Sequence, residues 1–378
     1  MSRTAEDLLE FDALREILRG YTTCAPGRRA VDALAPAAGR AALESAFHLI
    51  GEAMAWLRAG RELGFGALAD PAGWLEKLDA PASVLTPQEL LDAASLVETA
   101  ADLRETFKDE RPKFPRLAAQ VATLADVRPQ ARAIRSAVLP NGDISDAASS
   151  ELRRIRTAMG RTRDKIHKAL RDILRARAVE VSEDYITLRN DRFVIPVRAA
   201  ERRQVQGVVH GASATGQTLF VEPLETLELN NQLVQLAEDE AAEIARILRE
   251  LTDQLRGVLG PLRHIAATIA ELDSLFARGR FARAFDCCLP AFAAPGEAAP
   301  TRPAATGAPM LRLEAARHPV LEANLRKQGR KIVPISLALG GEEAVLVISG
   351  PNTGGKTVAL KTVGLAALAA QSGIPVAA

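Results

Sequence analysis

The sequence predicts a multidomain, mainly α protein in which long helices carry a small β-rich module and lead to the start of an α/β domain with a phosphate-binding loop. Three observations predict this fold class. Apolar residues recur at helical spacing along most of the chain, two segments carry long heptad seams, and a glycine-rich loop follows an apolar run near the C-terminal end. Aromatic residues make up only 4% of the 378 residues, which suits long helices better than β-sandwiches.

The composition limits the cellular compartment and the partners that can be expected for the protein. Its formal net charge is +1, so the chain as a whole is not drawn electrostatically to nucleic acid or membranes. Cys24, Cys287 and Cys288 form neither a disulfide framework nor a metal-ligand spacing, which favours a reducing cytosol. The N-terminus is amphipathic and acidic, unlike a signal peptide, and no apolar run reaches the length of a membrane span. We therefore expect a cytoplasmic protein with no membrane partner.

Residues 1–145 are expected to form a helical core domain. Apolar residues at helical spacing predict several helices in it, with glycine or proline at their ends. Thr86, Pro87 and Glu89 together form a capping-box start. The predicted helices are Thr4–Gly20, a short one opened by Pro26, Arg40–Gly60, and one that runs from Pro87 to about Phe107.

Two lever helices, 146–180 and 223–288, are expected to pack as an antiparallel coiled coil, with Ser145 or Asp146 as the cap of the first. Both carry apolar side chains at alternating three- and four-residue steps. The seam of the first helix consists of Leu152, Ile155, Met159, Thr162, Ile166, Ala169 and Ile173. The seam of the second consists of Val234, Ala237, Ala241, Ile244, Leu248, Leu251, Leu255, Val258, Leu262, Ile265, Ile269, Leu272 and Phe276.

Two further features of the lever segments bear on their geometry and partners. Gly260 and Pro261 interrupt the second lever, and proline removes a backbone hydrogen bond, so we expect a kink or a break there. The other faces of the first lever carry many arginine and lysine side chains. These side chains form either a solvated helix face or a surface that contacts phosphates.

A β-rich clamp is expected at residues 181–222, at the tip of the two levers. The predicted strand pairs are Tyr185–Arg189 with Phe193–Val197, and Val205–His210 with Gln217–Val221. A flexible loop, Gly211–Gly216, connects the second pair. The clamp is either a passive cap of the coiled coil or a contact surface for a macromolecule that bears phosphates. Its candidate nucleic-acid contacts are Arg189, Arg192, Arg198, Arg202 and Arg203.

The chain leaves the levers through an alanine- and proline-rich linker at 289–309 and enters the last predicted domain at 310–378. Met310–Leu313 has the composition of a strand. His318 lies in a turn just after it. Its side chain either forms a hydrogen bond within its own turn or approaches the base of a bound nucleotide.

A phosphate-binding loop lies in this last domain, after an expected strand at Ala344–Ser349 and before a helical pattern. The loop consists of Gly350, Pro351, Asn352, Thr353, Gly354, Gly355, Lys356 and Thr357. Its glycines allow backbone N–H groups to surround the phosphates of ATP at the start of a helix. We expect Lys356 to contact the β- and γ-phosphates and Thr357 to bind Mg²⁺.

Several of these segments together resemble one family. The loop that spells GPNTGGKT, the turn Ala316–Pro319, the segment Val208–Glu225 (VHGASATGQTLFVEPLE) and the opening LLEFDALREIL are similar to the MutS-like ATPases of the second bacterial type. These are paralogues that lack the mismatch-recognition domain. The resemblance covers nearly the whole chain from Leu8 onward and is weakest in the first domain and in the linker.

The resemblance implies an ABC-type ATPase that forms a homodimer through bound nucleotide, with lever arms that close on double-stranded or branched DNA or on a ribosome. It also implies suppression of homologous recombination, action on stalled or collided ribosomes with contacts to rRNA, and an endonuclease in a C-terminal Smr domain. The Mg²⁺-binding acidic strand, the signature loop and the Smr domain are expected beyond Ala378. The sequence is thus expected to be an N-terminal fragment with little ATP turnover of its own, since phosphoryl transfer needs those parts.

Other interpretations of the pattern stay open. A chromosome-structuring or break-repair ATPase also couples a phosphate loop to coiled coils, but such proteins usually begin with the loop. A scaffold that binds nucleotide without hydrolysing it is the non-enzymatic alternative. Phe220, Val221 and Glu222 spell the Phe-x-Glu of mismatch wedges, but they end a predicted strand, and mismatch repair is not supported.

Overall fold

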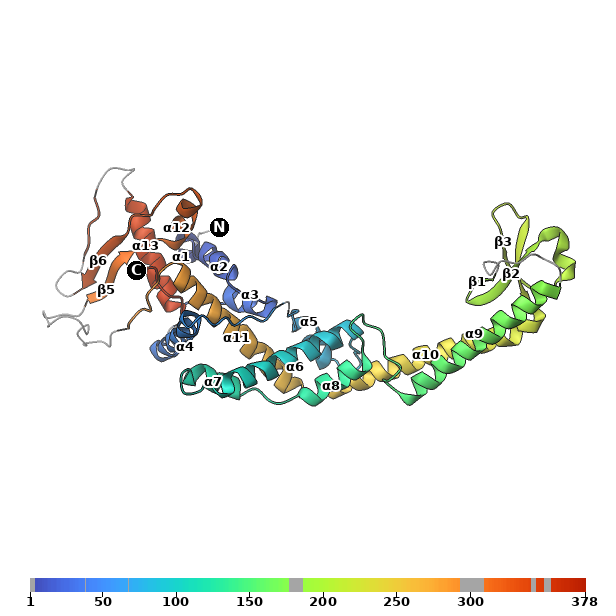
Figure 1. Cartoon of the computed structure of the whole chain (residues 1–378). Helices are drawn as coiled ribbons and strands as arrows, with labels where there is room; N and C mark the ends of the chain where they lie inside the picture. The colour runs from blue at the N-terminus through green and yellow to red at the C-terminus, as the bar shows by residue number, and fades with distance from the viewer. Residues whose placement is uncertain are drawn as a thin grey trace. The chain divides into compact units, whose positions relative to one another are not determined.

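The computed structural model describes residues 4–37, 39–66, 68–176, 186–292, 309–340, 345–349 and 355–378 (Figure 1). The chain divides into two compact units. The first comprises Met1–Glu76, Ser95–Arg128 and Val258–Ala378, and the second comprises Lys77–Ala94 and Pro129–Gly257. The described part is mostly helical with small antiparallel sheets, which confirms the mainly α class. None of its helices is long and apolar enough to cross a membrane.

Eight helices precede the first long arm helix in the described residues. They are α1 (Ala5–Leu8), α2 (Phe11–Arg19), α3 (Ala25–Asp32), α4 (Arg40–Arg58), α5 (Ala72–Asp79), α6 (Pro87–Lys108), α7 (Pro115–Ala122) and α8 (Arg128–Ala137). The capping box predicted for α6 is confirmed. Thr86 N donates to Glu89 Oε2 over 2.9 Å, and Glu89 N donates to Thr86 Oγ1 over 3.3 Å.

The expected single helix over Thr4–Gly20 was wrong, because it is broken between α1 and α2. Glu10 adopts a left-handed conformation with φ of 62° at the break. The break allows two contacts with α13 (Lys356–Gln371) that a continuous helix would not position. Leu9 packs so closely against Gly364 that a Cβ atom on that glycine would lie 2.5 Å from Leu9 Cδ2, and Glu10 forms an ion pair with Lys361. These contacts outweigh the helical propensity of the segment.

The core of the first unit forms around α11 (Leu259–Ala284), which packs against α3 and α4. Its predicted seam residues are fully buried at Leu262, Ile265, Ile269, Leu272 and Phe276. The expected break near Gly260 and Pro261 is confirmed, although it lies slightly earlier. The preceding helix α10 (Leu224–Arg256) ends before Gly257, and Pro261 lies in the first turn of α11, where its missing N–H is not needed.

A buried carboxylate joins α11 to the start of α3. Asp273 has no solvent exposure, and its carboxylate oxygens accept hydrogen bonds from Thr23 N, Thr23 Oγ1 and Cys24 N at 2.8–3.0 Å. It therefore caps the N-terminus of α3 from a distant part of the chain. Gly27 lies against the same carboxylate, since a Cβ atom there would be only 2.0 Å from Asp273 Oδ2.

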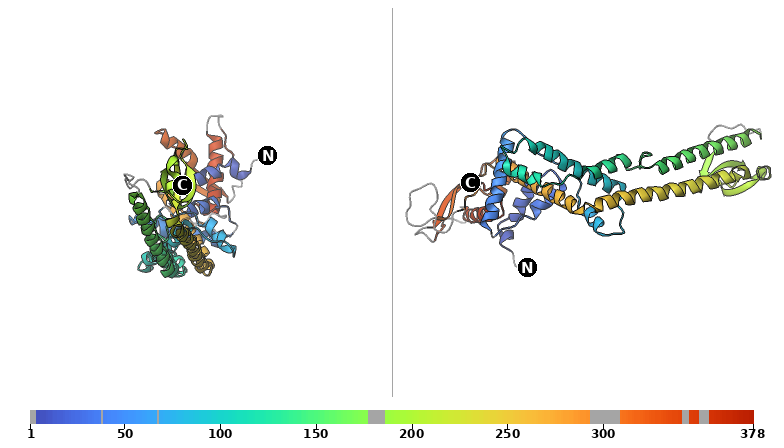
Figure 2. Two further views of the ribbon diagram at one scale, coloured as in Figure 1. Left: turned by 90° about the vertical axis from the view of Figure 1, so that its right-hand side faces the viewer. Right: turned by 90° about the horizontal axis from the view of Figure 1, so that it is seen from below.

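The arm of the second unit consists of α9 (Ser150–Ala176) and α10, which lie side by side and antiparallel (Figures 1 and 2). At one end of the pair Ser149 Oγ donates to Glu243 Oε1 over 2.7 Å, and at the other end Asn230 bonds to the backbone of Phe193. The cap of α9 is Ser149, whose Oγ accepts from Leu152 N, so the expected cap at Ser145 or Asp146 was wrong.

The predicted seams of the arm are correct only in part. Leu152, Ile155, Met159, Thr162 and Ile166 are buried as expected on α9. On α10 the predicted seam was also wrong away from the tip, where Ile247 is buried while Ala241 is exposed and Ile244 and Leu248 are only partly buried. Toward the tip, the buried residues are Leu170 and Leu174 instead of Ala169 and Ile173, and on α10 they are Leu233 and Leu236 instead of Val234 and Ala237. A different face of each helix is buried near the tip, because the sheet of the tip also packs on this end of the helices. Leu170 and Leu174 share a core with Ile195, Val197 and Val221.

The tip of the arm is a four-stranded antiparallel sheet with the strand order β1-β2-β4-β3. Its elements are β1 (Thr187–Arg189), β2 (Arg192–Arg198), the 3₁₀ helix η2 (Ala199–Gln204), β3 (Gly207–Ala212) and β4 (Thr218–Pro223). Asn190 and Asp191 form the predicted hairpin turn with φ of 48° and 59°. Both predicted strand pairs are therefore confirmed within the described residues, which begin at Ile186.

The C-terminal part of the first unit contains β5 (Pro309–Ala316), α12 (Pro319–Lys327), β6 (Ile335–Gly340) and α13. β5 pairs with β6 in antiparallel fashion, and the strand expected at Met310–Leu313 is confirmed. The strand expected at Ala344–Ser349 was wrong as far as the described residues 345–349 show, because they pair with no strand and Val345 is 78% exposed. A strand of a parallel sheet is paired with a neighbouring strand and buried on both faces. Most of the linker 289–309 falls outside the described residues.

Candidate functional site

Lys356 and Thr357, the last two residues of the predicted phosphate loop, form the first turn of α13. Gly355 precedes them in the left-handed conformation with φ of 80°, which glycine adopts without steric cost. Gly350, Pro351, Asn352, Thr353 and Gly354 lie outside the described residues, so their contacts with a nucleotide stay a prediction. The structure places the predicted cation and hydroxyl together at the start of a 16-residue helix.

The N-terminus of α13 is suited to an anion. Within the described residues no side chain caps it, and its first turn contains no acidic residue. The first N–H groups of a helix have no partner inside the helix, and the helix dipole favours negative charge at that end. A phosphate group could therefore accept from these N–H groups while Lys356 supplies a positive charge.

The helix that carries this site is fixed by packing on its opposite face. Leu365 and Ala369 share a core with residues of α2 and α11, and Ala366 packs with Leu313 of β5. One turn after Lys356, the Nζ atom of Lys361 lies 2.5 Å from Glu10 Oε1. The hydrogen bond and charge of Lys361 lower the pKa of Glu10 from its usual value near 4.5. The start of α13 is thereby anchored to the start of α2.

His318 lies close to this anchor as the cap of α12. Its ring is only 3% exposed, and Nδ1 accepts from Leu321 N over 3.4 Å, which fits the expectation of a hydrogen bond within its own turn. Burial lowers the pKa of His318, so the ring is neutral near pH 7. Nε2 then carries the proton, and it is buried without a partner among the described residues. Contact with a nucleotide base stays a prediction.

The described residues near the start of α13 fit a Mg²⁺ ion that is bound to a nucleotide, because they do not supply enough ligands to hold the ion alone. The described part of the chain contains no group of three His, Cys, Asp or Glu side chains that could hold a metal ion. Mg²⁺ at nucleotide sites is bound mainly by phosphate oxygens and water, with few protein ligands. The exposed hydroxyl of Thr357 would be the ligand that this segment supplies.

The five arginines predicted to contact nucleic acid divide into three environments in the tip. Arg192 donates to Glu222 and Asn231, and Arg202 donates to the carbonyl groups of Val205 and Gly207, so both hold the sheet together. Arg189 lies over the ring of Phe220, 4.6 Å from its centroid. Arg198 and Arg203 are exposed and have no hydrogen bond or ion pair from their side chains within the described residues.

Glu222 is a buried polar residue of the tip whose partners the sequence did not reveal. Its side chain is 1% exposed and accepts from Arg192 Nη1 over 2.9 Å and from His210 Nε2 over 2.6 Å. The carboxylate thus links β2, β3 and β4 and is not presented to a partner. The Phe220–Glu222 match to a mismatch wedge has this structural role here. No alternation of burial along β4 indicated it, because the last three residues of the strand are all buried.

Comparison with known proteins shows relatives along the whole chain. The chain is 38% identical over 372 residues to "Endonuclease MutS2" of Thermomicrobium roseum, which covers 97% of this chain and 46% of that protein. It is 33% identical over 380 residues to the protein of that name from Pelotomaculum thermopropionicum and 32% identical over 386 residues to "Putative endonuclease MutS2" of Bacillus subtilis. Each of these covers 100% of this chain and 46% of the relative. No family model matches the chain.

Proposed function

We propose that this chain is part of a MutS-family, ATP-dependent nucleic-acid clamp. The chain is homologous over its whole length to proteins named MutS2, which confirms the predicted resemblance to MutS-like paralogues. The chain spans about half the length of these relatives, at 46%. The observation that carries the proposal is the position of Lys356 and Thr357 at the uncapped, glycine-led start of α13, in a chain that also has a long arm with a β-sheet tip.

In this mechanism the residues of α13 hold the nucleotide and the tip contacts the partner. Backbone N–H groups of the first turn and Lys356 bind the phosphates, and Thr357 positions the Mg²⁺ that neutralises their charge. Binding free energy released there can change how the arm engages its partner only if ATP binds the two arm states with different affinity. The partner class is nucleic acid, either double-stranded or branched DNA or the RNA of a ribosome.

The relatives are also named endonucleases, and we propose that this protein shares that activity. The described residues hold no cluster of acidic or histidine side chains that could bind a catalytic metal ion, so these residues are not where we place the nuclease centre. We also propose a homodimer that forms through bound ATP. Light scattering with and without ATP and Mg²⁺ tests the dimer, and an unchanged monomer mass in both conditions contradicts it.

Lys356→Ala tests the nucleotide site. Losing the charge at the phosphates should weaken ATP binding at least about tenfold, since a charge-assisted hydrogen bond is worth roughly 1.5–3 kcal/mol. Calorimetric titration of ATP and Mg²⁺ into both proteins measures the change. Lys327→Ala, which removes an exposed lysine of α12, is the matched control and should bind ATP as the parent does. Unchanged ATP affinity in Lys356→Ala would refute the phosphate-loop assignment.

A further inference from the structure

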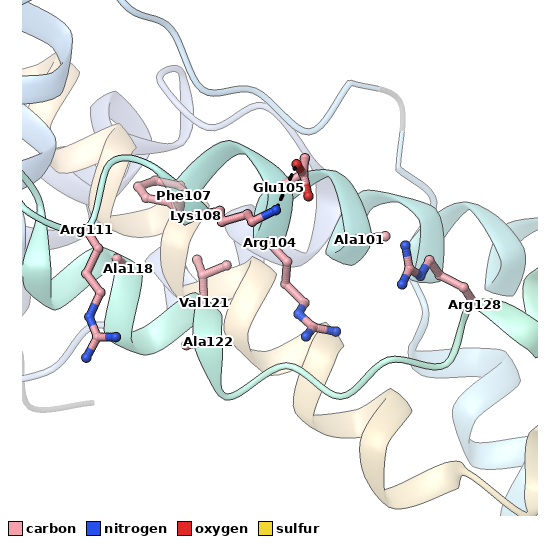
Figure 3. Close-up of a pocket in the computed structure, with 10 residues that line it drawn as sticks. All are labelled: Ala101, Arg104, Glu105, Phe107, Lys108, Arg111, Ala118, Val121, Ala122 and Arg128. Atoms are coloured by element: carbon pink, nitrogen blue, oxygen red, sulfur yellow. Dashed lines mark ion pairs between the residues drawn. The ribbon is translucent and has the colours of Figure 1, made fainter.

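A cavity of about 450 Å³ lies in the first unit, away from Lys356 in the sequence (Figure 3). It is bordered by the C-terminal half of α6, by α7 and by the segment that leads from α7 to Arg128. Its size falls within the range of about 300–1,000 Å³ typical of small-molecule sites. Neither the nucleotide site nor the tip accounts for it.

The rim of the cavity is strongly basic. Four cations, Arg104, Lys108, Arg111 and Arg128, line it against one carboxylate, Glu105. Figure 3 shows Arg104 extending from α6 toward the segment after α7, and Arg128 reaching back toward α6.

Two of these four cations form ion pairs, and the other two do not within the described residues. Lys108 pairs with Glu105 at 3.7 Å and Arg128 pairs with Asp126, its Nε donating over 2.8 Å. Within the described residues Arg104 and Arg111 make no hydrogen bond or ion pair, although both guanidinium groups are exposed. The hydrogen bonds and charge of Arg128 lower the pKa of Asp126, and the charge of Arg104 helps to lower the pKa of that carboxyl, whereas Arg111 has no carboxylate partner within this part of the structure. Both guanidinium groups are exposed and can reach an anion.

The floor of the cavity is apolar and fixed. Phe107, Ala118 and Val121 are buried beneath it, and Phe107 stacks on Trp56 with 4.9 Å between the ring centroids. The start of α7 is held by Glu52 of α4, whose carboxylate accepts from Arg116 N and Leu117 N at 2.9–3.1 Å. A ligand would thus meet a preformed apolar surface with cations around it.

We propose that this cavity, here called the α6–α7 pocket, binds a phosphate ester that carries an apolar or planar group, the chemistry of a nucleotide unit. Arg104 and Arg111 bind the phosphate and the ring lies on the floor formed by α6 and α7. Guanidinium groups match phosphate oxygens in bidentate geometry and also stack on flat rings, and three of the four rim cations are arginine. The nucleotide unit is either free or part of a single strand, and both sources present the same groups.

The test isolates the pocket from the other two candidate sites. The parent protein for all measurements carries Lys356→Ala and the pair Arg198→Ala/Arg203→Ala, which disable the nucleotide site and the exposed cations of the tip. Fluorescence anisotropy with a labelled hexathymidylate and its competition by AMP, inorganic phosphate or hexaglutamate give the affinities. Adding Arg104→Ala/Arg111→Ala should weaken hexathymidylate binding at least about tenfold and reduce the slope of log affinity against log salt by about 1.4, since single strands lose about 0.7 per phosphate contact.

Two further variants test the shape of the cavity and the effect of net charge. The first fills the cavity without changing its charge, and the second lowers the net charge without touching the cavity. Ala122→Trp places a large ring at the cavity without changing charge and should weaken binding similarly. Arg330→Ala/Lys331→Ala removes two exposed cations of the same unit outside the pocket and should leave binding unchanged. Thermal unfolding of each variant checks that the fold is intact.

Each result decides the proposal. Competition by AMP, with hexathymidylate binding lost in Arg104→Ala/Arg111→Ala, supports the pocket and shows that a free nucleotide also occupies it. Equal competition by hexaglutamate, equal losses from the Arg330/Lys331 control, or affinities unchanged by Arg104→Ala/Arg111→Ala would overturn it. Absence of any binding to the parent would overturn it too, while leaving the ATP site tested by Lys356→Ala untouched.

Discussion

Asp273 illustrates how one residue stabilises a distant element. Its fully buried carboxylate accepts from Thr23 N and Cys24 N, which lie just before the first helical residue of α3, Ala25. The sequence gives no local signal for this cap, because the capping side chain is 250 positions from Thr23. Pattern analysis finds caps only when the residue and the helix are neighbours, as for Thr86 and Glu89.

Asp273→Ala should therefore destabilise the first unit. It leaves two buried N–H groups without an acceptor and opens a small cavity, which together should cost about 2–4 kcal/mol of unfolding free energy. Asp273→Asn keeps one acceptor oxygen and should cost less. Urea titration followed by circular dichroism measures both, with Asp12→Ala as an exposed control. A loss below about 0.5 kcal/mol for Asp273→Ala would contradict the capping role.

The Glu10–Lys361 ion pair should make the free energy of unfolding depend on pH. Lys361 lowers the folded-state pKa of Glu10, so the pair stabilises the fold above the unfolded pKa near 4.5 and its contribution disappears as pH falls through the lower folded pKa. Both side chains are about a third exposed, at 39% and 34%, so the contribution should stay below about 1 kcal/mol. Unfolding free energies of Glu10→Gln and its parent should converge as pH falls below 4.5 and through the lowered folded-state pKa of Glu10. A difference that grows on acidification would contradict the pair.

At the scale of elements, the tip sheet shows which arginines can reach a partner. Arg202 holds the backbone of Val205 and Gly207, so its loss would unsettle η2 and β3 whatever the tip binds. The sequence predicted all five arginines alike, since residue type alone does not distinguish a structural guanidinium from an exposed one. Arg198 and Arg203 are the pair that the fold leaves available.

Replacing Arg198 and Arg203 by alanine should weaken binding of double-stranded DNA and reduce the slope of log affinity against log salt by about 1.8, at about 0.9 per phosphate contact. Filter binding over a series of salt concentrations measures the slope. Arg330→Ala/Lys331→Ala is the matched control. An unaltered slope in the tip variant would argue that the tip is a passive cap of the arm.

The arm helices show where periodicity predicts packing and where it fails. The seam of α9 was predicted correctly from Leu152 to Ile166, where one helix packs on one partner. It failed at Leu170 and Leu174, where the sheet of the tip adds a second partner and changes which face is buried. Heptad analysis assumes a single partner, so the change of phase could not be predicted before the tip was known.

At the scale of the whole molecule, the sequence predicted the mainly α class, the β-sheet tip and the start of α13, because these depend on local patterns of helix, hairpin and glycine. It could not predict that the second lever segment, 223–288, would be divided between units. α10 belongs to the second unit, while α11 is the buried centre of the first. The two helices carry similar apolar steps along the predicted seam, while the contacts of α3 and α4 with α11 bury further faces of that helix.

The long sequence separation between Asp273 and α3 also determines when α3 can be stabilised during translation. Thr23 and Cys24 emerge from the ribosome 250 and 249 residues before the carboxylate that satisfies them. At about 5–20 residues per second, α3 must wait roughly 12–50 s for its cap. The arm and tip, Pro129–Gly257, are made within that interval and form a continuous stretch of the second unit. An early-translated segment therefore waits for a late one, and until then it exposes apolar surface that α11 later covers.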